Sequence, residues 1–269
     1  MNWWNKKIEE PVTSPRKRTA SKRIHKTIQN AETIGSQDEP ERYIIYTDKI
    51  LGQGAFGAVY KGFDTKTKTD VVIKKFKSNS VLGFSSEESY LQEVDCLSYI
   101  REDCIKLGLI CYIDHFEFET KSDDTPITEY YIVSNLLDGY ITLDDLLEEP
   151  QYILTKEMAD KIKDKIETAV YALHKKGIRH GDLHQGNIMV DPRTLDADVQ
   201  VRLIDFGLCL LPEKGKGMFS KMKDYLKFFM IIMEKQSLDN LFYVIDNKVN
   251  KEQKQSSRSP SRKSRSPSK

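Results

Sequence analysis

The chain has 269 residues, of which 39% are hydrophobic and 31% charged, and its formal net charge is +1. This length suits one domain or one two-lobed unit, and no stretch approaches the roughly 18 apolar residues of a membrane span. The N-terminus, Met1-Asn2-Trp3-Trp4-Asn5, leads into basic residues and not into the apolar core of a secretory signal. We therefore expect an intracellular protein without a membrane span.

The near-neutral total conceals basic ends on an acidic body. Residues 1–30 contain eight Lys or Arg against two Glu, residues 254–269 contain six Lys or Arg and no acid, and the remainder has a net charge of −11. Basic segments with few apolar residues are typical of solvated arms. We expect a flexible N-terminal arm over residues 1–40 and a disordered tail over residues 251–269.

After the arm, the sequence predicts a hairpin with a glycine-rich turn. Residues 43–50 and 58–63 are apolar and β-branched enough to form strands, and Leu51-Gly52-Gln53-Gly54-Ala55-Phe56-Gly57 lies between them. Glycines there let backbone amides approach phosphates. The same spacing marks dinucleotide-binding turns, but those open a helix, and Val59-Tyr60 is a poor helix start. A plain glycine-rich hairpin is the remaining alternative.

A third predicted strand, near residues 70–77, carries two adjacent lysines. Side chains alternate between the two faces of a strand, so Val72 and Lys74 share one face and Lys75 lies on the other. The two lysines therefore cannot serve the same site.

A helix is predicted near residues 86–101, and three of its glutamates are of interest. Glu93 falls in the middle of the helix, whereas Glu87 and Glu88 fall in the first turn, where they would also suit a solvated helix start.

The rest of the chain is predicted to contain two further strands and then mainly helices. The strands lie near 110–119 and 129–135, and they are followed by a helix from Thr155 to Lys176 that stops at Gly177. A hairpin of 188–190 with 200–204 and an apolar helix over 218–233 complete the prediction.

Two segments in the second half carry carboxylates at the ends of short apolar runs. Asp182 lies in His180-Gly181-Asp182-Leu183-His184-Gln185-Gly186-Asn187, and Asp205 begins Asp205-Phe206-Gly207. Two carboxylates and an amide suit a site that holds a divalent cation over a polyphosphate, because Mg²⁺ prefers a few oxygen ligands. Taken singly, each Asp could equally be a turn former on a loop.

In this order, the glycine-rich turn, the strand lysine and the two Asp segments resemble the protein-kinase superfamily. The resemblance implies an α+β, bilobal protein-kinase-like fold. Its N-lobe, residues 41–137, would have five strands and one main helix, and its C-lobe, residues 138–250, would be shortened and mostly helical.

The resemblance also implies a role for each matching residue. Lys74 would contact the α- and β-phosphates of ATP and pair with Glu93, while Asp182 would accept or orient the proton of the acceptor hydroxyl. Asn187 and Asp205 would hold Mg²⁺, with Mn²⁺ as an alternative. Further nucleotide contacts would come from the turn, the third strand, the connection between the lobes and the C-lobe hairpin: Leu51, Gly52, Gly54, Gly57, Val59, Val72, Asn135, Leu137 and Met189.

The chain departs from the protein-kinase pattern in ways that affect function. Gly181 replaces an Arg that clamps a phosphorylated activation loop, so a non-RD kinase without that control is expected. His184 replaces a Lys that touches the γ-phosphate; it could contact phosphate when protonated or bond to nearby backbone.

The region after the second Asp segment is also short for this family. Only 62 residues follow Gly207, and no A-P-E segment is among them. Asp224 resembles a buried Asp that supports the catalytic loop, with an exposed helical Asp as the alternative.

In these features the chain is similar to small-molecule kinases, to RIO and tRNA-modification-complex kinases, and to minimal kinases of large DNA viruses. Three functions therefore stay open. The first is an ATP-dependent Ser/Thr protein kinase, the second a small-molecule kinase or complex-bound ATPase, and the third a pseudokinase scaffold. The scaffold is disfavoured because Lys74, Asp182, Asn187 and Asp205 are all present.

The sequence also carries signals for partners and cellular location. Substrates are expected among proteins, basic ones included, and the tail repeats Arg258-Ser259-Pro260-Ser261 and Arg265-Ser266-Pro267-Ser268 offer autophosphorylation sites. The basic ends would suit nucleic acid or nuclear import, or simply solubility. Cytoplasm or nucleus is expected, or host cell or virion if the source is viral. Cys96, Cys104, Cys111 and Cys209 lack metal-binding spacing and are expected to be reduced, buried thiols.

Overall fold

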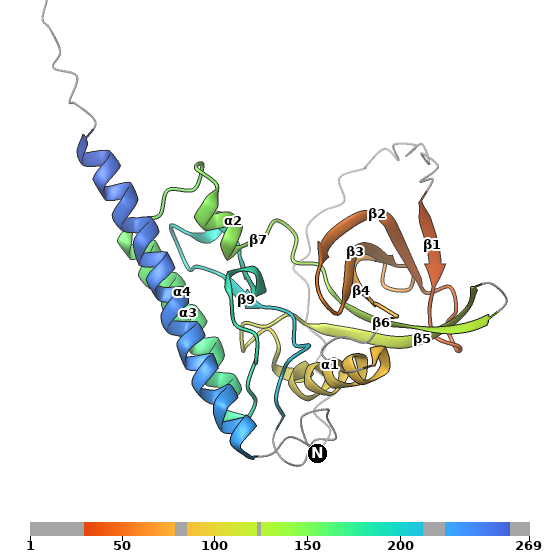
Figure 1. The fold of residues 1–269 in the computed structure, drawn as a ribbon. Coiled ribbons are helices and arrows are strands. Elements are labelled where there is room, and N and C mark those ends of the chain that lie inside the picture. The colour runs from red at the N-terminus through yellow and green to blue at the C-terminus, as the bar shows by residue number, and fades with distance from the viewer. Residues whose placement is uncertain (1–29, 79–84, 123–124, 212–223, 259–269) are drawn as a thin grey trace, which may run out of the picture.

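The computed structural model describes residues 30–78, 85–122, 125–211 and 224–258. These residues form two lobes, a sheet-rich lobe with one main helix and a lobe dominated by two long helices (Figure 1). The bilobal α+β fold expected from the sequence is thus the fold of the protein.

In the N-lobe, the described strands form one antiparallel sheet of six strands in the order β1-β2-β3-β4-β6-β5. The strands are β1 (Ala31–Ile34), β2 (Tyr43–Gln53), β3 (Gly57–Asp64), β4 (Thr69–Phe76), β5 (Tyr112–Ser122) and β6 (Thr125–Asn135). The glycine-rich segment turns the β2–β3 hairpin as predicted, and Gly54 N–H donates to the carbonyl oxygen of Gly57 at 2.9 Å.

The sixth strand corrects the expectation of five. Residues 31–34 were assigned to a flexible arm, yet they pair with β2 from Ala31↔Tyr46 to Ile34↔Tyr43. Ile34 is buried in a cluster with Tyr43, Ile45 and other residues of the sheet. Burial of this apolar side chain against the sheet gives the segment a structure that its short polar sequence did not predict.

The main N-lobe helix, α1 (Ser86–Ile100), packs beneath the sheet (Figure 1) and starts at a capping box. Glu88 N–H donates to Ser85 Oγ at 3.1 Å, and Ser85 N–H donates to Glu88 Oε2 at 2.9 Å. This box satisfies two backbone donors at the helix start and fixes where α1 begins. Glu93, two turns further on, is consequently carried on the buried face.

The C-lobe contains a small sheet and two long helices. The sheet has the order β7-β8-β9, from β7 (Ile141–Thr142), β8 (Ile188–Val190) and β9 (Val201–Leu203). The long helices are α3 (Lys156–Lys175) and α4 (Asp224–Arg258), and the lobe also contains the short helix α2 (Leu143–Glu148) and the 3-10 turns η2 (Gln185–Asn187) and η3 (Pro192–Thr194). A further 3-10 turn, η1 (Arg101–Asp103), follows α1 in the N-lobe. None of the helices in the described ranges combines the length and apolar character that crossing a bilayer requires.

The end of α3 matches its sequence prediction. Gly177 adopts φ +75°, its N–H donates to His174 O at 2.9 Å, and the N–H of Ile178 donates to Leu173 O at 3.0 Å. This pair of bonds is a Schellman motif, which needs a left-handed residue and therefore favours glycine. The turn directs the chain into the segment that contains Asp182.

Helix α4 runs antiparallel to α3 and is longer than expected. Asp246 pairs with Lys163 at 2.7 Å, and Glu252 Oε2 accepts from the N–H of Leu154 at 2.7 Å. Residues 251–258, expected to belong to a disordered tail, are helical in the structure, and Glu252 among them is bonded to the chain just before α3. Leu241, Ile245 and Val249 bury the apolar stripe of α4.

The cysteines correct a second expectation. Instead of four reduced thiols, the structure contains the disulfides Cys96–Cys209 and Cys104–Cys111. The first joins residues 113 positions apart in the chain. Spacing could not reveal this pairing, because the fold and not the sequence brings α1 beside the segment after Asp205.

Candidate active site

A lysine held between two carboxylates lies where the lobes meet. Lys74 on β4 places its Nζ 2.6 Å from Glu93 Oε2 on α1 and 2.9 Å from Asp205 Oδ1 after β9. Lys74 and Asp205 are 131 positions apart in sequence. The convergence expected from the motifs is therefore present in the fold.

The alternation of β4 selects Lys74 over its neighbour. The side chain of Lys75 points to the other face of the sheet and pairs with Glu129 Oε1 at 2.7 Å. The rival glutamates are also separated, since Glu88 caps α1 and Glu87 is exposed. Only Glu93, with 5% of its side chain exposed, reaches the lysine.

The three groups shift one another's pKa values. Burial is the largest effect on Glu93 and raises its pKa to about 7, although Lys74 opposes the shift. Lys74 has the largest effect on Asp205 and holds its pKa below the ordinary value. Burial by itself would lower the pKa of Lys74, but Asp205 and Glu93 outweigh it and the pKa is raised. Lys74 is therefore a permanent cation at neutral pH.

The backbone at Asp205 is strained. Its φ of +61° lies in the left-handed region, which is uncommon for a residue other than glycine. Asp tolerates this conformation better than most residues because its short side chain can bond locally, and Gly207 N–H donates to Asp205 Oδ1 at 3.3 Å. In this conformation the Asp205 carboxylate faces Lys74, with Oδ1 2.9 Å from Nζ.

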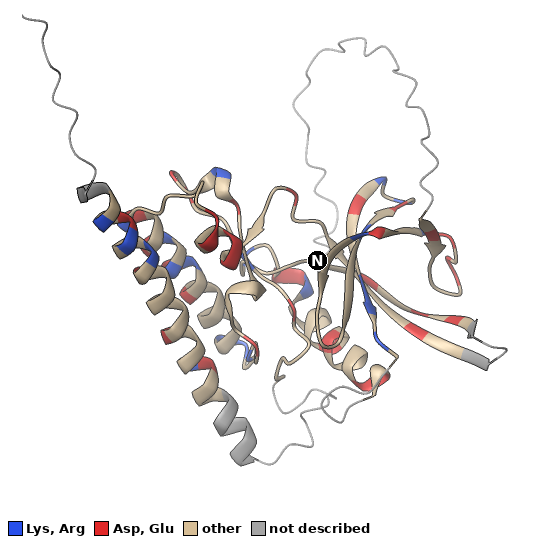
Figure 2. Ribbon diagram, turned by 45° about the horizontal axis from the view of Figure 1, so that its top comes forward, with Lys and Arg blue, Asp and Glu red and all other residues tan. Residues whose placement is uncertain are grey.

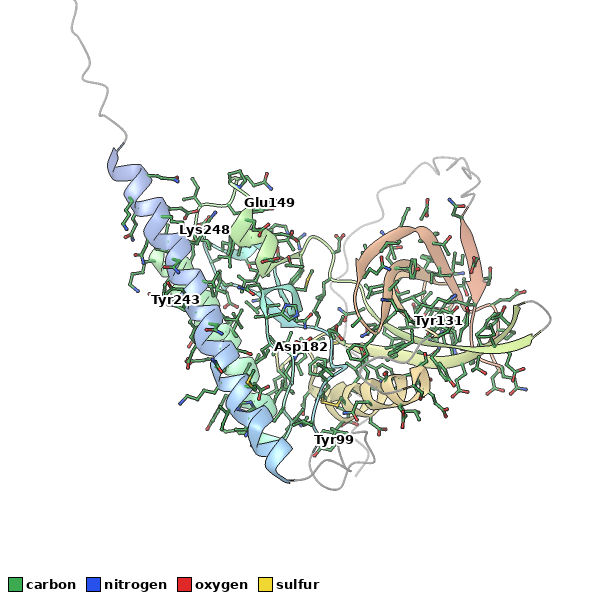
Figure 3. All side chains as sticks on the ribbon, viewed as in Figure 1. Tyr99, Tyr131, Glu149, Asp182, Tyr243 and Lys248 are labelled. Atoms are coloured by element: carbon green, nitrogen blue, oxygen red, sulfur yellow. A yellow bond between two sulfur atoms is a disulfide. The ribbon has the colours of Figure 1, made fainter. Side chains whose placement is uncertain are left out.

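Asp182 and Asn187 form a second polar pair. Asn187 Nδ2 donates to the Asp182 carbonyl oxygen at 2.9 Å and to Asp182 Oδ2 at 3.3 Å. Asp182 is 43% exposed at its side chain and lies between the lobes (Figure 3), so its carboxylate is open to solvent. The Asn187 amide nitrogen is thus committed, which orients its oxygen as the atom that a cation would take.

Backbone bonds join the two polar groups into one array. The N–H of Ile204, the residue before Asp205, donates to Asn187 O at 3.0 Å. The His180 ring is buried between these groups. Its Nε2 lies 3.0 Å from Ile204 O, and its Nδ1 accepts from the N–H of Asp182 at 3.4 Å. The ring also packs on Phe206, with 4.8 Å between the two ring centroids. Burial lowers the pKa of His180, which favours the neutral ring that these bonds require.

Gly181 occupies a place that no other residue fits. Its φ is +84°, and an added Cβ would lie 2.0 Å from the carbonyl oxygen of Leu208. The nearby bonds between Arg179 and Leu210, at 2.8 and 2.9 Å, hold the two strands of chain at this separation. The glycine at this position is therefore required by packing.

Glu234 on α4 is a buried residue that the motifs did not reveal. Its Oε1 accepts from the backbone N–H of His180 at 2.7 Å, and its Oε2 lies 2.8 Å from His174 Nε2. Burial opposes ionisation, but the hydrogen bonds from His174 and His180 outweigh it and lower the pKa of Glu234. Glu234 therefore supports this loop from α4. The support expected from Asp224 stays a prediction, because the Asp224 side chain lies outside the described part of the chain. A single acid directly after an apolar helical run was the available signal.

His184 makes the backbone contact that was one of its two expected roles, and its contact with phosphate stays a prediction. Its Nδ1 accepts from the N–H of Gly186 at 3.1 Å, which is the backbone-bonded alternative. Its Nε2 lies 3.8 Å from Asp182 Oδ2 on an exposed side chain. The ring is therefore fixed by backbone and directed toward the catalytic-loop carboxylate.

The expected nucleotide contacts are distributed over four elements. Leu51, Gly52, Gly54, Gly57 and Val59 lie on the β2–β3 hairpin, Val72 on β4, Asn135 and Leu137 at and after the end of β6, and Met189 on β8. The Asn135 side chain is occupied elsewhere, because its Oδ1 accepts from the N–H of Cys111 at 2.7 Å. The backbone N–H of Asn135 is also bonded, to the carbonyl oxygen of Cys111 at 2.9 Å, so Cys111 takes both groups.

The residues present fit a hard cation bound together with phosphate. Within the described ranges, no group of three or more His, Cys, Asp or Glu side chains could hold a metal ion unaided. The Asp205 carboxylate and the Asn187 amide oxygen would supply two oxygen ligands, and Mg²⁺ commonly completes such a set with phosphate and water.

A two-lobed fold with a lysine between two acids and a separate Asp–Asn pair is the arrangement of a protein kinase domain. The family profile for the protein kinase domain matches residues 45–228, more than half of the chain, and the protein belongs to that family.

Curated relatives agree with this assignment. The chain is 31% identical over 171 residues to serine/threonine-protein kinase 33 of Bos taurus, and the aligned region covers 62% of this chain and 32% of the relative. It is 28% identical over 176 residues to calcium-dependent protein kinase 4 of Plasmodium falciparum, covering 65% and 30%. It is 24% identical over 201 residues to the ovarian-specific serine/threonine-protein kinase Lok of Drosophila melanogaster, covering 72% and 39%. The match thus spans about a third of the length of these relatives.

Proposed function

We propose that the protein is an ATP-dependent Ser/Thr kinase that moves the γ-phosphate of ATP to a protein hydroxyl. The observation that carries this proposal is the placement of the Lys74 ammonium between Glu93 and Asp205, at 2.6 and 2.9 Å. The names of two of the relatives, which are serine/threonine-protein kinases, support the choice of acceptor.

Each polar side chain has a distinct task in this proposal. Lys74 binds the α- and β-phosphates, and Glu93 keeps its ammonium in place. Asp182 orients the acceptor hydroxyl and takes its proton, while Asn187 and Asp205 are the groups that hold Mg²⁺, with Mn²⁺ as an alternative. The metal, when bound, supplies charge neutralisation at the phosphates. The remaining catalysis comes from placement, which Glu234 and His180 provide for the loop.

Activity in this proposal does not depend on a phosphorylated activation loop. The Leu208 carbonyl oxygen occupies the space that a side chain at Gly181 would need, so the chain cannot carry the Arg that reads such a phosphate. The protein is therefore proposed to be of the non-RD type.

Charge suggests which substrates are suitable. Outside the basic ends the chain has a net charge of −11, and acidic residues gather on α2, with Asp144 and Asp145 exposed (Figure 2). Basic proteins and the serines of the chain's own basic termini are therefore the proposed acceptors. Contact of the basic termini with nucleic acid remains a further proposal, and salt-dependent binding would support it.

A small-molecule kinase or a complex-bound ATPase is the second candidate. The observations that favour it are Gly181, His184 directed toward Asp182, and a C-lobe in which the match to the kinase domain ends at residue 228. A pseudokinase scaffold is disfavoured by the assembled charges around Lys74.

Labelled ATP separates these candidates. The full chain is incubated with ATP labelled at the γ-phosphate and Mg²⁺, beside Asp205→Ala and Asp182→Asn, with a basic protein as acceptor. Label on protein, reduced about 100-fold or more in both variants, supports the proposal. Release of phosphate without protein label supports the ATPase, and no turnover with unimpaired folding supports the scaffold.

A further inference from the structure

The two disulfides join very different parts of the molecule. Cys96 lies on α1, three residues after Glu93, and Cys209 lies four residues after Asp205. Cys104 and Cys111, by contrast, are only seven positions apart and close a short loop between η1 and β5. Only the first disulfide connects the two elements whose acids meet on Lys74.

The surroundings of Cys96–Cys209 reinforce this connection. Both cysteines are fully buried, and the Gln92 side-chain amide donates to the Cys209 carbonyl oxygen. Gly207 lies against the acids themselves, since a Cβ added there would be 3.3 Å from Asp205 Oδ1 and 3.4 Å from Glu93 Oε2. The segment that the disulfide joins to α1 therefore reaches the Lys74 cluster through Gly207.

The cluster needs such a restraint because its charges do not all attract. Glu93 and Asp205 carry the same charge and are brought together only through Lys74, and Glu93 must give up most of its hydration to reach it. Without the covalent bond, the Gln92 hydrogen bond and the apolar packing of α1 would have to hold α1 against the segment that carries Cys209. Movement of α1 would return Glu93 to water and leave Lys74 paired with Asp205 alone.

We propose that Cys96 and Cys209 form a reversible thiol–disulfide modification site that controls the position of α1 and hence kinase activity. The disulfide form keeps Glu93 and Asp205 on Lys74, and the dithiol form releases α1. The activity part of this inference rests on the proposed phosphotransfer; the movement of α1 does not.

The exchange is balanced by a dithiol reductant. One thiolate of the reductant attacks a sulfur of the Cys96–Cys209 bond, forming a mixed disulfide and releasing the other cysteine as a thiolate. The second thiol of the reductant then displaces the first cysteine. Two electrons and two protons end on Cys96 and Cys209, and the reductant leaves as its own disulfide. A disulfide such as oxidised glutathione reverses the reaction.

The second disulfide is a matched internal control. Cys111 is only partly buried, whereas Cys96 and Cys209 are inaccessible until the structure opens locally. We expect dithiothreitol to reduce Cys104–Cys111 first and Cys96–Cys209 more slowly. Activity should follow the second event and not the first.

The test uses the full chain purified without reductant. Mass spectrometry of peptides from a non-reducing digest follows each disulfide during incubation with dithiothreitol, while transfer of labelled phosphate and hydrogen exchange of α1 amides are measured at the same times. We expect reduction of Cys96–Cys209 to lower phosphotransfer about tenfold and to speed exchange in α1. Cys96→Ser should match the reduced wild type, and Cys104→Ser should match the oxidised wild type and keep its response to reductant.

Chemical reduction of the wild type keeps the test decisive if Cys96→Ser fails to fold. Absence of a Cys96–Cys209 peptide pair would overturn the inference, and so would unchanged activity and unchanged α1 exchange after this bond is reduced. If neither form transfers phosphate but α1 exchange still follows the redox state, control of α1 is supported and the proposed function is rejected.

Discussion

Glu93 and Asp205 share Lys74, but their environments differ. Glu93 is almost entirely buried, and its pKa of about 7 places its ionisation close to neutral pH. Asp205 retains 38% exposure of its side chain and a lowered pKa, so it stays ionised. The ion pair of Glu93 with Lys74 therefore forms over a pH range in which Asp205 does not change.

We expect phosphotransfer to increase as pH rises through about 7, because only ionised Glu93 holds Lys74 in place. The measurement is kcat/KM for ATP between about pH 5.5 and about pH 8.5, which reports ionisations of the free enzyme. Glu93→Gln should be less active and should lack this rise. A rise of equal size in the variant would assign it to another group.

The ionisation of Glu93 that is expected to raise activity is also expected to lower the stability of the folded protein. The pKa of Glu93 in the folded protein lies above its ordinary value of 4.5, so folding favours the protonated side chain. The contribution of this preference to the free energy of unfolding is fully present below pH 4.5 and is lost as pH rises to about 7. Wild type should therefore lose stability relative to Glu93→Gln over this interval. Denaturant unfolding at several pH values would show it, and a constant difference would contradict it.

Gly181 allows a sharper prediction at a single position. We expect Gly181→Ala to destabilise the protein by at least about 1–3 kcal/mol, since its Cβ would be 2.0 Å from a backbone oxygen at φ +84°. Gly139→Ala is the control, because its φ of +76° is similar but the nearest atoms, at 2.8 Å, belong to the Arg193 guanidinium, which can move. Equal losses of Tm in the two variants would be inconsistent with the clash.

At the scale of elements, α4 supports the loop that carries Asp182. The helix is anchored along α3, and Glu234 extends from it to the backbone of His180. The Asp182 loop is thus bonded to α4 on one side and to Ile204 on the other. A change on α4 is therefore expected to reach the chemistry through backbone position.

Replacing Glu234 tests this support. Glu234→Ala would leave the N–H of His180 and the ring of His174 without their partner, and we expect a loss of about 2–4 kcal/mol together with a fall in kcat. Glu252→Ala is the matched control, because this carboxylate also accepts a backbone N–H but is partly exposed and lies at the other end of α4. A normal kcat in Glu234→Ala would exclude a positioning role.

At the scale of the whole molecule, the proposed nucleotide site uses both lobes. Lys74 and Glu93 come from the N-lobe, whereas Asp182, Asn187 and Asp205 come from the C-lobe. A ligand held by both sets should stabilise the complete folded chain, because only the folded state brings the sets together.

We therefore expect a non-hydrolysable ATP analogue with Mg²⁺ to raise the unfolding free energy by about 2.7 kcal/mol at a hundred times its Kd. Thermal unfolding measures the shift, and Asp205→Ala should abolish most of it. The analogue without Mg²⁺ is the control. Equal shifts in the wild type and in Asp205→Ala would argue against a site that spans the lobes.

Several features of this protein follow from the sequence alone because their causes are local. Alternation along β4 distinguished Lys74 from Lys75, and the glycine spacing predicted the β2–β3 hairpin. Gly177 marked the end of α3 for the same kind of reason, since a left-handed residue is needed where the Schellman bonds form. Motif order was enough to indicate the bilobal fold.

Only the tertiary structure decided which distant residues meet. A glutamate on a helix looks the same in sequence whether it contacts water, a lysine or a backbone N–H, so only packing revealed the contacts of Glu234 with His174 and His180. The partner of Cys96, the extra strand β1 and the occupied side chain of Asn135 depend likewise on contacts between remote segments. Short-range pattern determined the elements of this chain, and long-range packing determined their polar and covalent partners.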